Sequence, residues 1–144
     1  MSLIFSRQCE YALQAVLYLA LKPAGEMTSI KELTSKLSIP YHFLAKILQD
    51  LKNKGLLDSL KGPMGGFRLA MSADRISLIR IVEAIDGPGV FTNCVLGFEE
   101  CSSKNPCAVH QTWGDLRDRI RNMLADKSVA ELAKEMRKPE YGFA

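Results

Sequence analysis

A glycine-rich turn between two short apolar runs is the feature that most limits how this 144-residue chain can fold. The segment LLDSLKGPMGGFRLA, residues 56–70, places Gly62, Pro63, Gly65 and Gly66 close together. Glycine and proline at this density favour a tight turn, and the flanking runs are the right length for two paired strands. The segment therefore predicts a β-hairpin with a glycine-rich tip.

Three helices are expected before this hairpin. Ser6 can cap the first helix, whose apolar positions recur at helical spacing until the chain reaches Pro23. Ser29 begins an S-x-x-E capping box that predicts a short second helix. Pro40 is expected to open the third helix and Gly55 to end it. The buried stripe of the third helix is predicted to be Leu44, Ile47, Leu48 and Leu51.

Two short helices joined by a tight turn and followed by a hairpin are typical of a winged helix-turn-helix, which binds DNA. Any surface helix carries polar residues, so the hairpin that follows is what favours DNA binding. Residues 1–72 hold nine Lys/Arg against five Asp/Glu, whereas residues 73–144 hold ten against eleven. The candidate DNA contacts are Tyr41, His42, Lys46 and Gln49 on the third helix and Lys61, Gly65, Gly66 and Arg68 on the wing.

The sequence divides into a DNA-binding domain at residues 1–86 and a second half of different character. Residues 87–107 are predicted to be a cysteine-bearing loop, and Asn105 is expected to cap a long helix over residues 106–125. A short helix and tail are expected over residues 126–144. Apolar residues in the long helix step by four and three, as in a coiled-coil seam. The predicted dimer seam consists of Val109, Trp113, Leu116, Ile120 and Met123. The alternative is that these residues pack on their own domain.

Three of the four cysteines gather in the segment NCVLGFEECSSKNPCAVHQTW, residues 93–113. Cys94, Cys101, Cys107 and His110 form a C-x6-C-x5-C-x2-H pattern, which suits metal ligation. We expect Cys107 in the first turn of the long helix, with His110 on the same helix face. Structural zinc sites usually use shorter spacers, so the pattern favours an iron–sulfur cluster over zinc, with thiol chemistry as a further alternative.

The composition is that of a globular protein, with 47% hydrophobic and 24% charged residues. The longest apolar stretch, residues 11–21, is interrupted by Gln14 and is too short to span a bilayer, and it lacks signal-peptide flanks. We therefore expect a cytoplasmic protein without a membrane partner, in which reduced thiols are favoured over a disulfide. The sequence contains no nucleophile–base pairing or nucleotide loop, so neither an enzyme nor a small-molecule substrate is predicted.

Several motifs together resemble the bacterial Rrf family of winged-helix regulators, which includes the IscR, NsrR and CymR types. They are EYALQAVLYLAL, IPYHFLAKILQDLKNKGLL, the wing KGPMGGFRLA, the helix end AIDGP and the cysteine segment with CAVHQTW. The resemblance covers nearly the whole chain and implies a homodimer that binds promoter DNA, with long C-terminal helices crossing between subunits. Because three cysteines match the cluster-binding members, the CymR type, which lacks this triad, is a poorer match than the IscR/NsrR type.

The resemblance implies that Cys94, Cys101 and Cys107 hold an iron–sulfur cluster, with 2Fe–2S favoured over 4Fe–4S. The fourth ligand is His110 if the chain follows the IscR pattern, or Glu10 from the other subunit if it follows the NsrR pattern. We favour His110. Six residues separate the first two cysteines here, against five in the IscR pattern, which bears on the loop geometry and the cluster type. Cys9 has no counterpart in the triad and is expected to be a half-buried structural thiol.

The fold class predicted from these features is mainly α with a small β-hairpin wing, in which a winged helix-turn-helix domain precedes a long C-terminal dimerisation helix. The predicted function is a homodimeric transcription regulator whose cluster senses cluster supply, redox state or nitric oxide and thereby sets the affinity for double-stranded DNA. Two alternatives remain: the same DNA-binding protein with a thiol switch or zinc site, or a cluster-carrying redox protein.

Overall fold

The computed structural model describes residues 4–140, so the last four residues of the predicted tail lie outside the described part. The predicted fold class is confirmed, because the chain is mainly helical with one two-stranded antiparallel hairpin. The elements in order are α1 (Arg7–Leu21), α2 (Ile30–Leu37), α3 (Tyr41–Asn53), β1 (Leu57–Leu60), β2 (Gly66–Leu69), η1 (Ala73–Arg75), α4 (Leu78–Asp86), η2 (Pro88–Phe91), α5 (His110–Asp126) and α6 (Val129–Met136).

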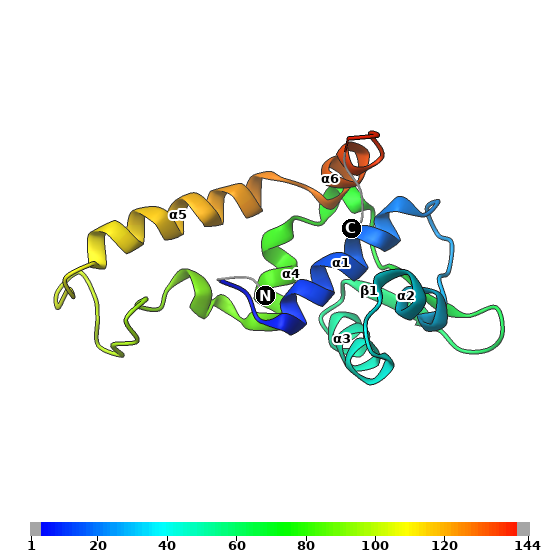
Figure 1. The fold of residues 1–144 in the computed structure, drawn as a ribbon, viewed down its shortest axis with the longest axis horizontal. Helices are drawn as coiled ribbons and strands as arrows, with labels where there is room; N and C mark the ends of the chain where they lie inside the picture. Colours follow the sequence, from blue (N-terminus) through cyan, green and yellow to red (C-terminus); the bar gives the residue numbers. More distant parts are fainter. Residues whose placement is uncertain (1–3, 141–144) are drawn as a thin grey trace.

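The molecule consists of a compact body and an arm (Figure 1). The body contains α1 to α4, the hairpin and α6, whereas α5 and the loop beneath it extend side by side away from the body. The wing and the tip of the arm lie toward opposite ends of the longest axis. No helix in residues 4–140 is long and apolar enough to cross a membrane.

Helix α1 runs through the centre of the body and contacts α2, α3, α4, α6 and β2. Its buried side chains include the small residues Ala12 and Ala15, which let neighbouring helices approach closely. Ser6 caps its first turn by accepting a hydrogen bond from the Cys9 backbone N–H at 3.1 Å, as the sequence predicts. At its other end, Arg137 donates to the carbonyl oxygens of Ala20 and Leu21, which ties the segment after α6 to α1.

The helix-turn-helix is built as its apolar pattern predicts. All four stripe residues of α3, Leu44, Ile47, Leu48 and Leu51, are buried in the main core. Pro40 is the N-cap residue of α3 rather than its first helical residue, and Lys54 is the C-cap with Gly55 following it. Gly55 has a φ of +79°, a left-handed conformation that glycine adopts without strain.

The hairpin pairs Leu57 with Leu69 and Leu60 with Gly66 in an antiparallel register. A contact that sequence periodicity does not reveal attaches it to the body: Thr28 and Phe67 exchange two backbone hydrogen bonds of 2.9 and 2.8 Å. The segment before α2 therefore pairs with β2 and holds the wing beside the helix-turn-helix.

Two wing glycines have structural reasons to be glycine. A Cβ atom added to Gly65 would lie 2.0 Å from the Leu60 carbonyl oxygen, and one added to Gly66 would lie 2.2 Å from the Thr28 carbonyl oxygen. Both distances are far below any tolerated contact, so neither position accepts a side chain. The sequence pattern predicts DNA contact for these two glycines, whereas their backbone packing already requires glycine.

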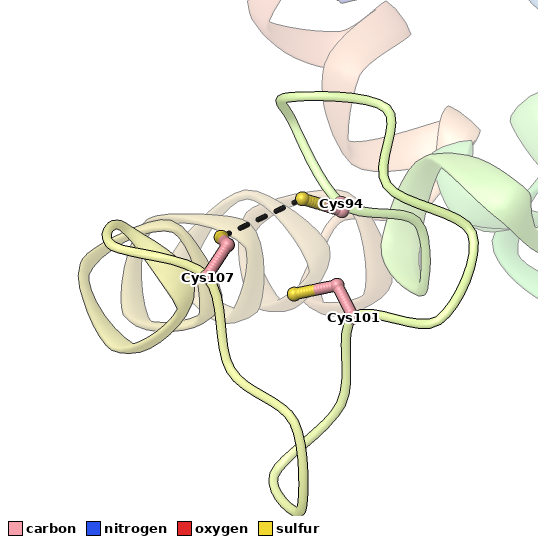
Figure 2. Close-up of side chains that lie close together, drawn as sticks. All are labelled: Cys94, Cys101 and Cys107. Atoms are coloured by element: carbon pink, nitrogen blue, oxygen red, sulfur yellow. Dashed lines mark hydrogen bonds between the residues drawn. The ribbon is translucent and has the colours of Figure 1, made fainter.

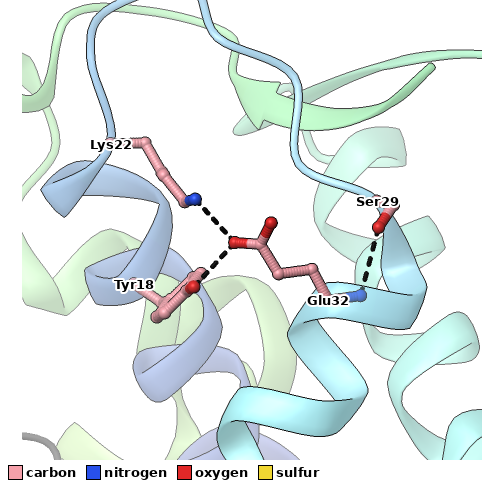
Figure 3. A network of polar contacts seen from close by, with 4 residues as sticks. All are labelled: Tyr18, Lys22, Ser29 and Glu32. Atoms are coloured by element: carbon pink, nitrogen blue, oxygen red, sulfur yellow. Dashed lines mark hydrogen bonds and ion pairs between the residues drawn. The ribbon is translucent and has the colours of Figure 1, made fainter. Parts of the chain in front are cut away.

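The capping box predicted at Ser29 and Glu32 requires two hydrogen bonds, of which one forms and the other does not. Ser29 accepts a hydrogen bond from the Glu32 backbone N–H at 3.1 Å. The Glu32 side chain does not return to Ser29 and instead accepts from the Tyr18 hydroxyl at 2.7 Å (Figure 3). Lys22 forms an ion pair with the same carboxylate at 2.6 Å. This network joins α1 to the start of α2.

We expect Glu32→Gln to lower the free energy of unfolding at pH 7 by no more than about 1 kcal/mol, because the pair is partly exposed. Hydrogen bonds from Lys22 and Tyr18 lower the pKa of the Glu32 carboxyl. The contribution of the Glu32 carboxylate to the free energy of unfolding is therefore complete above its unfolded-state pKa of about 4.3. It disappears as the pH falls through the lowered pKa of the folded state. Urea unfolding of both proteins at several pH values measures this. The exposed Glu83→Gln is the matched control, and an equal loss in both variants would contradict the assignment.

Candidate metal centre and nucleic-acid interface

The cysteine loop is held beneath α5 by two side chains of that helix. Trp113 donates its indole N–H to the Asn93 carbonyl oxygen at 3.0 Å, and Arg117 Nη1 reaches the same oxygen at 3.4 Å. Because Asn93 precedes the first cysteine of the loop, these bonds fix the point at which the loop turns under the helix.

The loop brings the three predicted cysteine ligands together. The Sγ atoms of Cys94, Cys101 and Cys107 lie within 4.8 Å of one another, although the residues span fourteen positions of sequence (Figure 2). The Sγ atoms of Cys94 and Cys107 are 3.6 Å apart. All three side chains are partly buried free thiols, and they line a common cavity of about 240 Å³.

His110 adjoins this group, but not in the way the sequence predicts. Its Nδ1 atom lies 3.2 Å from Cys101 Sγ, and it lines the same cavity. The sequence places the start of the helix at Asn105 and Pro106, but α5 begins at His110. Cys107 therefore lies in the turn before the helix, so the predictions of a shared helix face and of a first-turn effect on its thiol are both wrong.

A local turn explains the later start of α5. The backbones of Ser102 and Asn105 exchange hydrogen bonds of 3.2 and 3.1 Å, which closes a small loop. The Ser102 hydroxyl also accepts from the Asn105 backbone N–H at 3.2 Å. Asn105 is thus used inside this turn and does not cap a helix, and the chain reaches helical geometry only after Cys107.

The donor set fits a thiophilic metal centre. Three sulfur ligands with an adjacent imidazole are typical of zinc and of iron–sulfur clusters. Two sulfurs on one ion, each about 2.3 Å from it, can lie at most about 4.6 Å apart, and the 3.6 Å between Cys94 and Cys107 meets this condition. The residues present would therefore hold either kind of centre with little movement of the loop.

The pKa values of Cys94 and Cys101 are shifted in opposite directions. Burial acts to raise the pKa of Cys94, but the backbone N–H groups of Phe98 and Leu96 lower it. Hydrogen bonds with the other two thiols lower the Cys94 pKa further, to about 7. For Cys101, the Cys107 backbone N–H acts to lower the pKa, whereas burial and the neighbouring thiols raise it by more. Of these two thiols, Cys94 is thus the one better prepared to act as a thiolate at neutral pH.

Glu10, the alternative fourth ligand, lies in the first turn of α1 and pairs with Arg7 at 3.6 Å. It is not part of the group formed by the three sulfurs, and its predicted role requires a second subunit. The neighbouring Cys9 is fully buried rather than half-buried and packs with Val82, Phe91 and Leu124. Burial and the charges of Asp86 and Glu10 raise the Cys9 pKa to about 12, which suits an inert structural thiol.

The predicted DNA contacts on α3 are exposed. Tyr41, His42, Lys46 and Gln49 all face solvent, and the first two stack edge to face with ring centres 5.7 Å apart. Sequence reasoning missed Phe43, whose side chain is 54% exposed beside them. Its apolar character and its position next to the buried stripe made it resemble a core residue.

On the wing, Lys61 is exposed near the tip, and Met64 at the tip is 86% exposed. Arg68, also predicted to contact DNA, instead lies along the hairpin. Its guanidinium is 3.8 Å from the Asp58 carboxylate and 3.5 Å from the Gly25 carbonyl oxygen. Arg68 would have to give up or share these contacts to reach a phosphate.

The predicted dimer seam divides into two faces of α5. Trp113 turns toward the cysteine loop, and Ile120 packs against the smaller core of its own chain. The other three seam residues form an outward row at heptad spacing: Val109, Leu116 and Met123 are 37%, 49% and 57% exposed. Of the five predicted seam residues, Trp113 and Ile120 thus follow the alternative of packing on their own chain, and the other three are exposed.

A winged helix-turn-helix body with a cysteine-bearing helical arm defines a class of DNA-binding regulators rather than enzymes. The model of the Rrf2 family, described as an iron-dependent transcriptional regulator, matches residues 5–135. The chain therefore belongs to the Rrf2 family of transcriptional regulators, and it is not an enzyme.

Relatives and solved structures agree with this assignment. The chain is 35% identical over 132 residues to a protein of Aquifex aeolicus assigned as an HTH-type transcriptional regulator, covering 90% of this chain and 91% of that protein. It is 32% identical over 124 residues to the regulator IscR of Xenorhabdus nematophila, covering 86% and 75%. The structure of CymR, the global cysteine regulator of B. subtilis, superposes with a TM-score of 0.77 at 25% identity, covering 93% and 98%.

We expect iodoacetamide to alkylate Cys94 faster than Cys101 in reduced, metal-free protein at pH 7. With a pKa of about 7, Cys94 changes from roughly one tenth ionised at pH 6 to roughly nine tenths at pH 8. The rate at Cys94 should rise accordingly, whereas Cys9 should stay unmodified while the protein is folded. Peptide mass spectrometry of timed samples gives each rate. A Cys94 rate that keeps rising to a midpoint near pH 9 would contradict the assignment.

Proposed function

We propose that this Rrf2-family regulator binds promoter DNA as a homodimer, with an iron–sulfur cluster on the arm setting its DNA affinity. The observation that carries the proposal is the approach of Cys94, Cys101 and Cys107 to within 4.8 Å, with His110 beside Cys101. When bound, a cluster supplies a centre that responds to iron–sulfur supply, to redox state or to nitric oxide. We favour 2Fe–2S over 4Fe–4S, because the resemblance of the cysteine motif to the IscR type implies it.

Ligation would make the arm more rigid. The loop is tied to α5 through the Asn93 carbonyl, but its apolar residues Val95, Leu96 and Phe98 are exposed and contribute little packing. Drawing Cys94 and Cys101 toward Cys107 and His110 would close the loop against the start of α5. A local change of this kind needs a differential binding energy of only a few kcal/mol to shift a two-state equilibrium.

The outward row of α5 offers the route from the arm to DNA. Val109, Leu116 and Met123 are exposed at heptad spacing, which suits a matching helix from a second copy. A dimer formed there would set the distance between two α3 helices and so match a two-fold operator. Rigidity in the arm would then determine how well this distance fits the DNA.

At each half-site, the N-terminal part of α3 would enter the major groove. His42, Lys46 and Gln49 carry donors for base edges or phosphates, and Tyr41 adds an aromatic contact. The glycine-rich wing lets its backbone approach the phosphates closely, with Lys61 as the exposed cation.

A second candidate is a thiol switch in which Cys94 and Cys107 form a disulfide. Their Sγ atoms are already 3.6 Å apart, and the lowered pKa of Cys94 favours attack by its thiolate. The Cys94 thiolate would attack a peroxide to give a sulfenic acid, and the Cys107 thiolate would then displace hydroxide from it to form the disulfide. This switch would tie the loop to the same point before α5 without any metal.

We expect anaerobically purified protein to be brown, and Cys94→Ala, Cys101→Ala and Cys107→Ala each to lose the visible absorption. Cys9→Ala is the matched control, because Cys9 lies in the core away from the ligand group, and it should keep the colour. Iron and acid-labile sulfide analysis with absorption spectroscopy measures the outcome. Loss in His110→Ala with retention in Glu10→Gln would identify the fourth ligand.

Colourless wild-type protein with stoichiometric zinc, from a preparation able to assemble clusters, would exclude the iron–sulfur version. Metal-free protein that gains a reversible Cys94–Cys107 disulfide under mild oxidant would support the thiol switch instead. Mass analysis of non-reduced peptides distinguishes these outcomes.

We expect Lys46→Ala and Lys61→Ala each to weaken operator binding several-fold and to reduce the salt dependence by about one unit of slope, because each removes one phosphate or base contact. Lys134→Ala is the matched control: Lys134 is exposed on α6, outside the α3 and wing surface. Gel shifts at several salt concentrations measure the slope. Unchanged affinity in both test variants would remove this surface as the DNA contact.

A further inference from the structure

Arg117 lies on the inner face of α5, on the same side of the helix as His110 and Trp113. The three residues are spaced i, i+3 and i+7, and all three line the cavity that contains the cysteine thiols. Among the residues that line this cavity, Arg117 is the one with a permanent positive charge. A fixed cation therefore borders a pocket built of sulfur ligands.

The hydrogen bonding of Arg117 is incomplete. Its Nη1 atom reaches the Asn93 carbonyl oxygen at 3.4 Å, while its Nε–H is buried and has no hydrogen-bond partner within residues 4–140. Buried donors without partners are uncommon in native proteins, so this one indicates a role for the side chain. Fastening the loop is not a sufficient role, because Trp113 already donates to the same carbonyl at the shorter distance of 3.0 Å.

The chemistry of the pocket supplies a reason for the cation. Three cysteine ligands act as thiolates and bring three negative charges to one small cavity. The neighbouring hollow on the loop side is lined by Glu99 and Glu100, which add negative charge nearby. A guanidinium at the cavity wall offsets this charge, and a positive charge close to an iron–sulfur centre influences its potential.

We propose that Arg117 is a tuning residue of the metal centre, stabilising the anionic sulfur set and raising the reduction potential of the bound cluster. This inference rests on the proposed iron–sulfur function. Reduction adds one electron and one unit of negative charge, and the nearby cation favours the more negative state. Arg117 acts through its charge, and it is not a ligand.

The test compares Arg117→Gln, which removes the charge, with Arg117→Lys, which keeps it. Arg121→Gln is the matched control, because it removes the same charge from an exposed position of the same helix. Each anaerobically purified protein is titrated with dithionite through redox mediators, and the oxidised and reduced cluster are followed by absorption and electron paramagnetic resonance.

At a fixed potential, the ratio of reduced to oxidised cluster should fall about tenfold in Arg117→Gln, equivalent to about 59 mV for a one-electron couple. Arg117→Lys should recover most of this difference, and Arg121→Gln should match wild type. If Arg117→Gln is folded by circular dichroism but assembles no cluster, while Arg117→Lys does, the need for a cation is also supported.

A potential in Arg117→Gln equal to that of wild type would overturn the inference and leave the proposed function intact. An equal drop in Arg117→Gln and Arg121→Gln would also overturn it, because the effect would then be one of general charge. Wild-type protein that assembles no cluster would overturn the proposed function itself, so the two failures are distinguishable.

Discussion

The burial of α1 at the centre of the body is the interaction on which the other elements depend. Ala12 and Ala15 are completely buried, and their small size lets α3, α4 and α6 pack closely around the same helix. The two ends of α1 serve different parts of the molecule. Near its start, Ser6 bonds to Asp86 at the end of α4, beside the root of the arm. Near its end, Tyr18 bonds to the start of α2. One helix thus joins the side that carries the cysteine arm to the side that carries the helix-turn-helix.

The parts of the fold that follow from local pattern were predictable from the sequence. The stripe of α3 recurs at helical spacing, and the proline and glycines of the wing specify a turn, so both elements emerged as expected. The three cysteines were also identified as one group, because chance rarely gathers three of a chain's four cysteines in one short segment. The short distance between the three cysteines in the sequence was enough to group them, because one loop carries all of them.

The features that were missed depend on tertiary or loop contacts. Asn105 carries a strong capping signal, but its pairing with Ser102 uses the same groups in a loop. The apolar row of α5 resembles one seam, because periodicity alone cannot show that Trp113 bonds to a loop twenty residues earlier. Likewise, nothing in the hairpin sequence reveals that Phe67 pairs with Thr28. In each case a contact within the loop or with another segment overrides the local preference.

The close backbone approaches at Gly65 and Gly66 have a consequence for how operator preference can change among relatives of this protein. Because these positions tolerate no side chain, the wing cannot acquire new side-chain chemistry there without disturbing the hairpin at Gly65 or its attachment to Thr28 at Gly66. Met64 at the tip and Phe43 on α3 are exposed to solvent, so their side chains are not constrained by packing in the same way. Substitutions at these two positions can therefore change the chemistry of the exposed α3 and wing surface without disturbing a close backbone contact.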